Sequence, residues 1–416
     1  MWKGPGVRED AKNAALIAGS ALVGMFATAG IFGTGAGPEL RVHTVHPPVI
    51  DQPLASYEMV EPLSGTNRLY GTVHTQRGPA VTGFLRWDRN EGSWSDLLDA
   101  TKFVDGEAVN QSGIRFGHVA EIQAVGRNLA IFKLRSGQEI GMTSQASDLG
   151  RGLRALIVTE ASGAQTELEW RDIRNVEFSA VPDGATPAEG RLHGTLTTRS
   201  GLSFTGYVAW DIDEIYSTDV LDGEAHGEDY EIPFGAIQSI DRQSSRAARV
   251  QLHSGEELVL SGTKDVNRRN GGISISDPQL GQVKVEWDEF SRIEFHGAAA
   301  EVSLSDFDGG VDLTGTVLTE SGDEIEGAVR WDRDEARTWE LLNGNANGVE
   351  FHIELSQVAL IEKAVRGSRV TLKDGREFHL SGSNDVTRDN RGIVVESGGQ
   401  SYVTEWNDFK SLSLLR

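Results

Sequence analysis

Two short stretches in the middle of the chain, Leu192–Thr198 (LHGTLTT) and Phe204–Asp211 (FTGYVAWD), decide the fold class. Apolar or small residues alternate with polar ones along both stretches. This period of two is typical of strands that bury one face of a sheet. A Ser-Gly pair at Ser200 and Gly201 lies between them, and such pairs favour the tight turn of a β-hairpin. We therefore expect two antiparallel strands at this place.

The same pair of stretches recurs on either side of this position. LYGTVHT and VTGFLRWD begin at Leu69 and Val81, and LTGTVLT and IEGAVRWD begin at Leu313 and Ile325. A second motif, with a tryptophan at its second position, also occurs three times: Glu169–Phe178 (EWRDIRNVEF), Glu286–Phe295 (EWDEFSRIEF) and Glu405–Leu414 (EWNDFKSLSL). Self-similarity at a fixed period indicates tandem repeats, here of roughly 120 residues each.

The three repeats cover residues 67–180, 190–297 and 309–416, and we expect each to be all-β. Each repeat has two similar halves, which predicts two small SH3-like or Sm-like barrels, because closing a sheet removes its edges. One β-sandwich per repeat is the alternative. Helix is expected only as a single turn near Phe234–Ile237 and its counterparts. Six tryptophans occupy recurring strand positions and are expected in the core, since each buries a large area: Trp87, Trp170, Trp210, Trp287, Trp331 and Trp406.

An uncharged segment precedes the repeats, from Ala14 to Pro38. It predicts either a signal peptide, cut after Ala29, or a transmembrane anchor, because its length reaches that of a bilayer-spanning helix. Residues 1–37 are therefore expected to be a hydrophobic helix, and the proline-rich residues 38–66 a spacer. Both alternatives place the repeats outside the cytoplasm, in the periplasm, on the cell surface or in the medium.

Composition excludes several classes of function. The chain carries a net charge of −23, which opposes binding to nucleic-acid phosphates, so no nucleic-acid partner is expected. It contains no cysteine, which excludes disulfides, thiolate metal ligands and cysteine nucleophiles. No nucleophile elbow, phosphate-binding loop or zinc-protease motif is present, so neither a catalytic residue nor an organic cofactor is predicted. Membrane contact is expected only through the N-terminal segment.

Two acidic turns, one in repeat 2 and one in repeat 3, are candidate calcium sites, since Ca²⁺ prefers oxygen ligands. Their carboxylates belong to Asp211, Asp213, Glu214, Asp332, Asp334 and Glu335. Solvated acidic turns are the alternative. Paired carboxylates also serve glycoside hydrolysis, but a catalytic site is not expected to occur repeatedly along a chain of repeats.

One stretch in repeat 3, Val370–Gly382 (VTLKDGREFHLSG), is followed by Asp385 and Asn390 and resembles the first motif of Sm-like RNA-binding proteins. The resemblance covers only this part of repeats 2 and 3. In that family the Asp and Asn help to form a pocket for a base. The spacing here is one residue longer than in the family, and the acidic charge opposes RNA binding. The resemblance therefore informs the expected hairpin topology.

Repetition without catalytic motifs predicts an exported, non-catalytic binding or scaffold protein, with a protein or an extracellular polymer as its partner. The alternatives are an extracytoplasmic carbohydrate-active hydrolase and a calcium-stabilised adhesion or interaction module. Polar residues that gather in one cleft of a single repeat, without equivalents in the other two, would favour the enzyme. Identical polar surfaces on all three repeats would favour the binding protein.

Overall fold

The fold is all-β, as the alternating patterns predict. The computed structural model describes residues 65–104, 107–111, 113–143 and 148–415; the expected N-terminal helix and nearly all of the spacer lie outside these residues. No helix among them is long and apolar enough to cross a membrane. The described helical elements are single 3-10 turns, which confirms the expected turn near Phe234: η1 (Phe116–His118), η2 (Gly150–Gly152), η3 (Trp170–Asp172), η4 (Phe234–Ala236), η5 (Lys264–Val266), η6 (Leu304–Asp306) and η7 (Leu355–Gln357).

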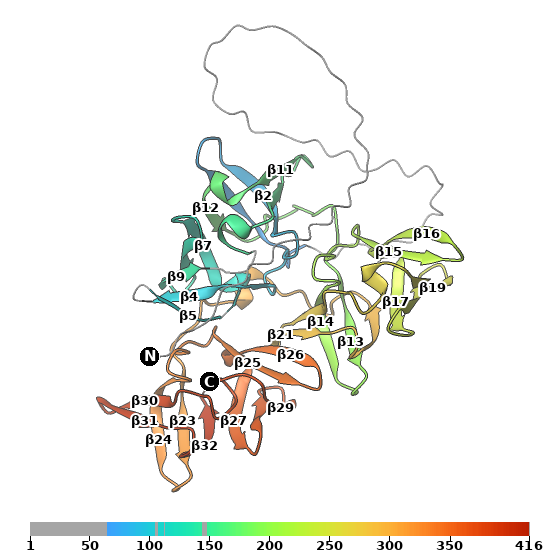
Figure 1. The fold of residues 1–416 in the computed structure, drawn as a ribbon. Helices are drawn as coiled ribbons and strands as arrows, with labels where there is room; N and C mark the ends of the chain where they lie inside the picture. The colour runs from blue at the N-terminus through green and yellow to red at the C-terminus, as the bar shows by residue number, and fades with distance from the viewer. Residues whose placement is uncertain (1–64, 105–106, 112, 144–147, 416) are drawn as a thin grey trace, which may run out of the picture. The chain divides into compact units, whose positions relative to one another are not determined.

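The predicted repeats are named by their residue ranges, repeat 1 for 67–180, repeat 2 for 190–297 and repeat 3 for 309–416. The strands of repeat 1 form an open ten-stranded sheet in the order β11-β10-β2-β1-β12-β7-β8-β9-β4-β5, and a separate pair, β3-β6 (Figure 1). Its strands are β1 (Tyr70–Thr75), β2 (Val81–Trp87), β3 (Leu97–Leu98), β4 (Thr101–Val104), β5 (Glu107–Gln111), β6 (Ile114–Arg115), β7 (Val119–Ala124), β8 (Leu129–Leu134), β9 (Glu139–Thr143), β10 (Leu156–Thr159), β11 (Gln165–Leu168) and β12 (Ile173–Phe178).

Repeat 2 contributes ten strands to a twelve-stranded sheet ordered β16-β15-β19-β18-β17-β22-β13-β14-β20-β21-β26-β25. These strands are β13 (His193–Thr198), β14 (Ser203–Ala209), β15 (Val220–Ala225), β16 (Glu228–Pro233), β17 (Ile237–Arg242), β18 (Ala247–Leu252), β19 (Glu257–Ser261), β20 (Ile273–Asp277), β21 (Gly281–Val285) and β22 (Phe290–Phe295). The last two strands of the sheet, β26 and β25, come from repeat 3.

Repeat 3 forms an eight-stranded sheet ordered β29-β28-β27-β32-β23-β24-β30-β31. Its strands, with the hairpin that joins the sheet of repeat 2, are β23 (Thr314–Thr319), β24 (Glu324–Arg330), β25 (Leu341–Ala346), β26 (Val349–Glu354), β27 (Val358–Ala364), β28 (Gly367–Leu372), β29 (Glu377–Leu380), β30 (Ile393–Ser397), β31 (Gln400–Thr404) and β32 (Phe409–Leu414). In all three sheets the first hairpin of a repeat pairs on one side with its closing strand and on the other with a later hairpin.

The recurring glycines of the motif are explained by this pairing. A Cβ atom on Gly83, Gly206 or Gly327 would lie 2.1–2.2 Å from a carbonyl oxygen of the neighbouring hairpin. No side chain fits at that separation, so the close approach of two backbones requires glycine at the equivalent position of every repeat.

The core lies on the apolar faces of these sheets. The six recurring tryptophans are between 0% and 8% exposed, which confirms that they belong to the core. One cluster of buried side chains runs through repeats 2 and 3, and a second fills repeat 1 together with Leu304, Phe307 and Trp339 of the later chain. Both clusters therefore cross repeat boundaries.

Buried ion pairs also connect the repeats. Arg191 of repeat 2 contacts Asp96 of repeat 1 at 2.9 Å, with side chains 1% and 3% exposed. Arg115 of repeat 1 contacts Glu354 of repeat 3 at 3.2 Å, with both side chains 4% exposed. Each of these two pairs holds repeat 1 against another repeat, because separating the partners would leave an unpaired charge away from water.

Candidate functional site

The acidic turns follow the tryptophan of the first hairpin in each repeat. The turn residue after that tryptophan has a positive φ in all three, 41° at Asp88, 48° at Asp211 and 44° at Asp332. Aspartate tolerates this left-handed conformation better than most residues. The turn brings the backbone of the glutamate four residues later next to that of the tryptophan. In repeat 2, Trp210 and Glu214 exchange two backbone hydrogen bonds of 2.9 and 3.0 Å.

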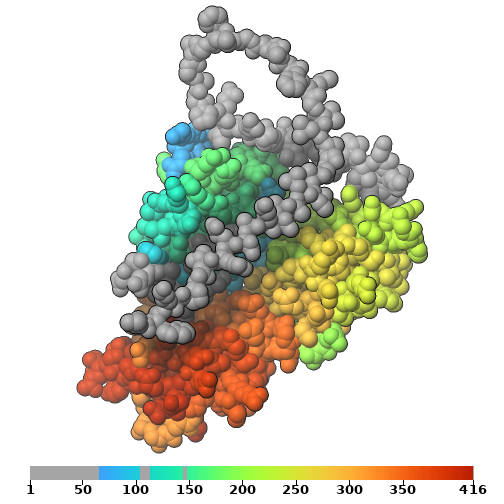
Figure 2. Space-filling model, in the orientation of Figure 1, coloured from blue at the N-terminus to red at the C-terminus, as the bar shows by residue number. Residues whose placement is uncertain are grey.

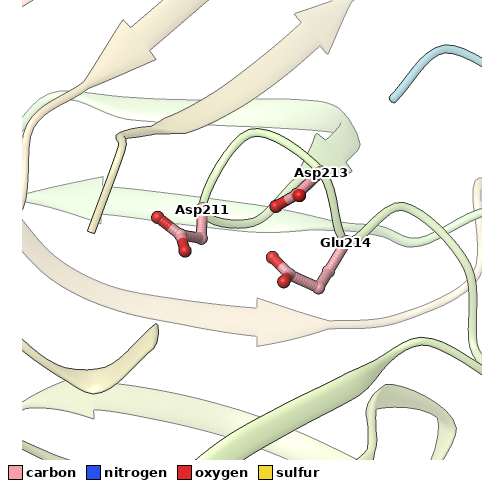
Figure 3. Close-up of side chains that lie close together, drawn as sticks. All are labelled: Asp211, Asp213 and Glu214. Atoms are coloured by element: carbon pink, nitrogen blue, oxygen red, sulfur yellow. The ribbon is translucent and has the colours of Figure 1, made fainter. Parts of the chain in front are cut away.

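In repeat 2, the turn gathers three predicted calcium ligands. Carboxylate oxygens of Asp211, Asp213 and Glu214 all lie within 4.8 Å of one another, and Figure 3 shows them gathered at one turn. Lys264 reaches the same place, with Nζ 2.5 Å from Asp211 and 3.7 Å from Asp213. Asp211 also accepts a hydrogen bond from the backbone N–H of Gly271. Its buried carboxylate is therefore held by the fold as well as by the lysine.

Glu214 differs from Asp211 because no cation lies in hydrogen-bonding contact with it among the described residues. Burial, then repulsion from Asp213, Asp265 and Asp211, raises the pKa of Glu214 to about 9. Its Oε2 atom is buried and has no hydrogen-bond partner among the described residues. Such a group is either protonated at neutral pH or stabilised by a cation that the chain itself does not provide.

The equivalent turn of repeat 3 is more deeply buried. Asp332, Asp334 and Glu335 again bring carboxylate oxygens within 4.8 Å. Arg391 binds Asp332 at 2.8 and 3.0 Å and also contacts Asp334. Glu335 is 2% exposed, and its Oε2 has no hydrogen-bond partner among the described residues. Burial, with the nearby Asp385 and Asp334, raises the pKa of Glu335 well above its ordinary value.

Repeat 1 has the same turn with one carboxylate fewer, because Asn90 replaces the middle acid. Arg154 binds Asp88 at 3.0 Å and the Asn90 side chain at 2.8 Å. Glu91 is 5% exposed, and its Oε2 has no hydrogen-bond partner in the part of the chain that the structure describes. Burial raises the pKa of Glu91 well above its ordinary value. Sequence reasoning did not single out Glu91, although the shared pattern Trp-Asp-x-x-Glu could have identified it.

Asp385 and Asn390, the two polar residues of the Sm-like resemblance, form hydrogen bonds within repeat 3. The carbonyl of Asp385 accepts the indole N–H of Trp331 at 3.0 Å, and its carboxylate accepts the backbone N–H of Asn343 at 2.7 Å. Asn390 accepts a hydrogen bond from the N–H of Gly392 at 2.9 Å. Asp385 and Asn390 are 2% and 5% exposed. Neither side chain faces an open surface where a base could stack.

A cavity in repeat 2 was not expected from the sequence. Its volume is about 160 Å³, and it lies among β13, β14, the end of β22 and the segments 65–68, 187–191 and 297–301. Its polar lining includes His193, Tyr207 and His296, and its apolar lining Leu192, Phe234 and Phe295. The walls therefore combine strands of repeat 2 with the start of repeat 1 and with the segments on either side of repeat 2.

The two histidines of this cavity contact each other. Their ring centroids are 5.1 Å apart in an edge-to-face arrangement, and His193 Nδ1 lies 3.1 Å from the carbonyl of His296. His296 Nε2 lies 2.8 Å from the hydroxyl of Thr195. Burial lowers the pKa of His193 to about 4, and burial raises the pKa of Tyr207 to about 12. Both groups are therefore neutral at physiological pH.

These polar groups are particular to repeat 2. The strand pairings that align His193 with Tyr207 align Tyr70 with Phe84 in repeat 1 and Thr314 with Ala328 in repeat 3. The position of His296 is taken by Ser179 and Leu415, as the equivalent backbone hydrogen bonds show. The three polar residues of the cavity thus come from one repeat, on strand pairings that have equivalents in the other two.

Comparisons with protein-family models, with curated protein sequences and with solved structures found no match for this chain.

Proposed function

We propose that the protein is an exported, non-catalytic binding protein. Three β-rich repeats form the framework, and the cavity of repeat 2 receives one unit of a protein or an extracellular polymer. Polar residues that gather in one repeat alone meet the condition stated above for an enzyme, but His193, Tyr207 and His296 include no pair of carboxylates of the kind that glycoside hydrolysis uses. We therefore propose binding, and the observation that carries it is the contrast between two kinds of polar residue. Those that recur in all repeats, such as Asp211 and Asp265, hold the backbone, whereas His193, Tyr207 and His296 occur once and line a cavity.

The size and chemistry of the cavity restrict its ligand. A volume of about 160 Å³ is close to that of a cavity that holds one benzene molecule. It can therefore accept a single aromatic side chain or sugar ring, and the rest of a partner would lie outside. The imidazole of His193 and the phenol of Tyr207 are both neutral and offer hydrogen bonds without a charge. The lining also holds two arginines and two glutamates, Arg68, Arg191, Glu189 and Glu301, whose charges are balanced in sign. A polar group without net charge therefore suits this site.

Fragment binding tests this proposal. We expect phenol, indole or an N-acetylated monosaccharide to shift the imidazole NMR signals of His193 and His296 in the full-length protein. Tyr207→Phe keeps the ring and should weaken binding of a hydrogen-bonding fragment, and Phe103→Leu, at an exposed strand position in repeat 1, is the control. If no fragment perturbs the two histidines, the binding proposal fails. Cleavage of a chromogenic glycoside that depends on these residues would instead establish the hydrolase alternative.

The location and the finer architecture are parts of the same proposal. The uncharged segment from Ala14 to Pro38 supports export, either by cleavage or as an anchor. The division of each repeat into two small barrels also stays a prediction. Mass spectrometry of the N-terminus, after separation of membrane and soluble fractions, tests the export claim. An intact chain in the cytosol would contradict it.

A calcium-stabilised module is the second candidate, and the unpaired carboxylate oxygen of Glu335 favours it. A divalent cation among Asp332, Asp334 and Glu335 would remove the cost of that buried acid. We expect calcium to raise the melting temperature relative to chelator, and Glu335→Gln to reduce the effect. Glu91→Gln is the matched control, because its turn has Asn90 in place of the middle acid. Equal melting temperatures with calcium and with chelator would refute this candidate.

A further inference from the structure

The last hairpin of repeat 3 has an unusual outer strand. β31 has the sequence QSYVT and forms one edge of the eight-stranded sheet. Four of its five residues are exposed, among them Tyr402 at 40% and Val403 at 52%. In Figure 1, β30 and β31 lie at the outer side of this repeat, and the same region is at the surface in Figure 2. An edge strand offers a row of free N–H and C=O groups for pairing.

The equivalent strand of repeat 2 already has a partner. β21 pairs antiparallel with β26 of repeat 3, from Gly281 opposite Ile353 to Val285 opposite Val349. Through this pairing Val283 and Val285 become fully buried. The fold can therefore add another antiparallel strand beside the position that β31 occupies. The pairing of β21 with β26 is an example within this chain.

The other edges carry features that discourage pairing. Edge strands of natural sheets are commonly protected by charged residues or proline. β16 has Glu228, Asp229, Glu231 and Pro233, and the edge strands β5, β11 and β29 each contain a glutamate. β25 has no charge but forms a bridge from Asn345 to Ser381. Among the edges of the three large sheets that the structure describes, β31 alone lacks a charge, a proline and a further bridge.

We propose that β31 pairs antiparallel with β31 of a second copy of this chain, so that the two eight-stranded sheets become continuous. A strand that pairs with itself about a two-fold axis must not set like charges opposite each other. The uncharged sequence QSYVT satisfies this condition, and an antiparallel register centred on Tyr402 places the two tyrosines together as a cross-strand aromatic pair.

The net charge of the chain determines how tight this association is. Two copies of charge −23 repel each other, and the contact has only five residues on each side. The dimer is therefore weak at low ionic strength, and added salt strengthens it by screening the repulsion. If β31 paired with the acidic strand β16 of a second copy, the charges of β16 would add to this repulsion. Pairing of β31 with β31 is therefore favoured over pairing with β16.

Cysteine crosslinking tests the contact directly, because the chain has no cysteine of its own. Tyr402→Cys and Val403→Cys are introduced singly into the full-length protein and exposed to a mild oxidant. Residues directly opposite in an antiparallel pair have Cα atoms about 4.5–5.5 Å apart, within the range of a disulfide. In the register centred on Tyr402, Tyr402→Cys places the two cysteines opposite each other, and we expect this variant to form covalent dimers quickly, and more quickly in added salt. Val403→Cys faces Ser401 in this register, so it should crosslink more slowly, and faster crosslinking there would show a register shifted by one residue. Association through the N-terminal segment would not produce this signal.

Val259→Cys is the matched control, since Val259 is 47% exposed but lies on β19, inside a sheet. In parallel, sedimentation equilibrium from micromolar to millimolar concentration compares the parent with Val403→Lys and Val259→Lys. The proposal expects the dimer to be lost in Val403→Lys only. It is overturned if the β31 cysteines crosslink no faster than Val259→Cys, or if Val403→Lys associates as the parent does.

Discussion

Replacing Glu214 by glutamine should stabilise the protein at alkaline pH. The pKa of this group is about 9 in the folded chain, against 4.5 for an ordinary glutamate. The folded state therefore keeps a proton that the unfolded state has released. Between these two pH values the folded state binds more protons, so the free energy of unfolding falls as pH rises. Glutamine cannot ionise, and the variant should lose this part of the pH dependence.

The magnitude follows from the gap between the two states. A pH of about 8 lies about 3.5 units above the ordinary pKa of a glutamate and still below the pKa of Glu214 in the folded chain. At 1.36 kcal/mol per unit, ionisation in the unfolded state alone lowers the free energy of unfolding by at most about 5 kcal/mol at this pH. Glu214 is partly accessible to water, and screening reduces the figure, so we expect a gain of about 1–2 kcal/mol. At about pH 5 the two proteins should differ by less than about 0.5 kcal/mol.

Urea denaturation of parent and variant at both pH values measures the effect. Glu256→Gln, an exposed turn residue of the same repeat, is the control and should leave the pH dependence unchanged. The reasoning is refuted if Glu214→Gln is less stable than the parent at alkaline pH, or if its stability falls with pH as steeply as that of the parent. Calcium should flatten the pH dependence of the parent if it binds at this turn, because a cation favours the ionised carboxylate.

Three further changes test the framework. Ile212 has a φ of 66°, which costs a β-branched residue about 1–2 kcal/mol, so Ile212→Asn should raise the melting temperature. Asp265→Ala should lower stability by about 1–3 kcal/mol in urea, because the backbone N–H of Asp222 loses its 2.8 Å partner, and Asp265→Asn should recover most of the loss. Burial raises the pKa of Glu354, but the contacts with Arg115 and His118 outweigh burial and lower this pKa to about 2. Glu354→Gln should therefore be destabilising above about pH 4.5, and the difference from the parent should shrink on acidification, as measured by thermal melts across pH.

The sequence by itself determined the strand content, the recurrence of the motif and the burial of the six tryptophans. The strand content follows from local alternation, since period two selects a strand. The burial of the tryptophans follows from their large apolar area, but the prediction that all six lie in strands is wrong: Trp170 begins η3, and Trp287 and Trp406 lie in turns before β22 and β32. The grouping of Asp211, Asp213 and Glu214 was also visible locally, because four consecutive residues form one turn. The pairing of Asp211 with Lys264 was not visible in the sequence, because the lysine and the turn come together only when distant hairpins meet.

Only the tertiary structure decided the cavity and the joins between repeats. His193 and His296 are 103 residues apart and meet because β13 pairs with the closing strand β22. The pairing of β21 with β26 crosses from one repeat to the next, and no local pattern distinguishes it from pairing within a repeat. Strand partners are chosen by the global arrangement of sheets, whereas alternation only says that a strand exists. For the same reason the sequence could not show that the uncharged strand β31 would form an edge of its sheet, with no described strand on its outer side.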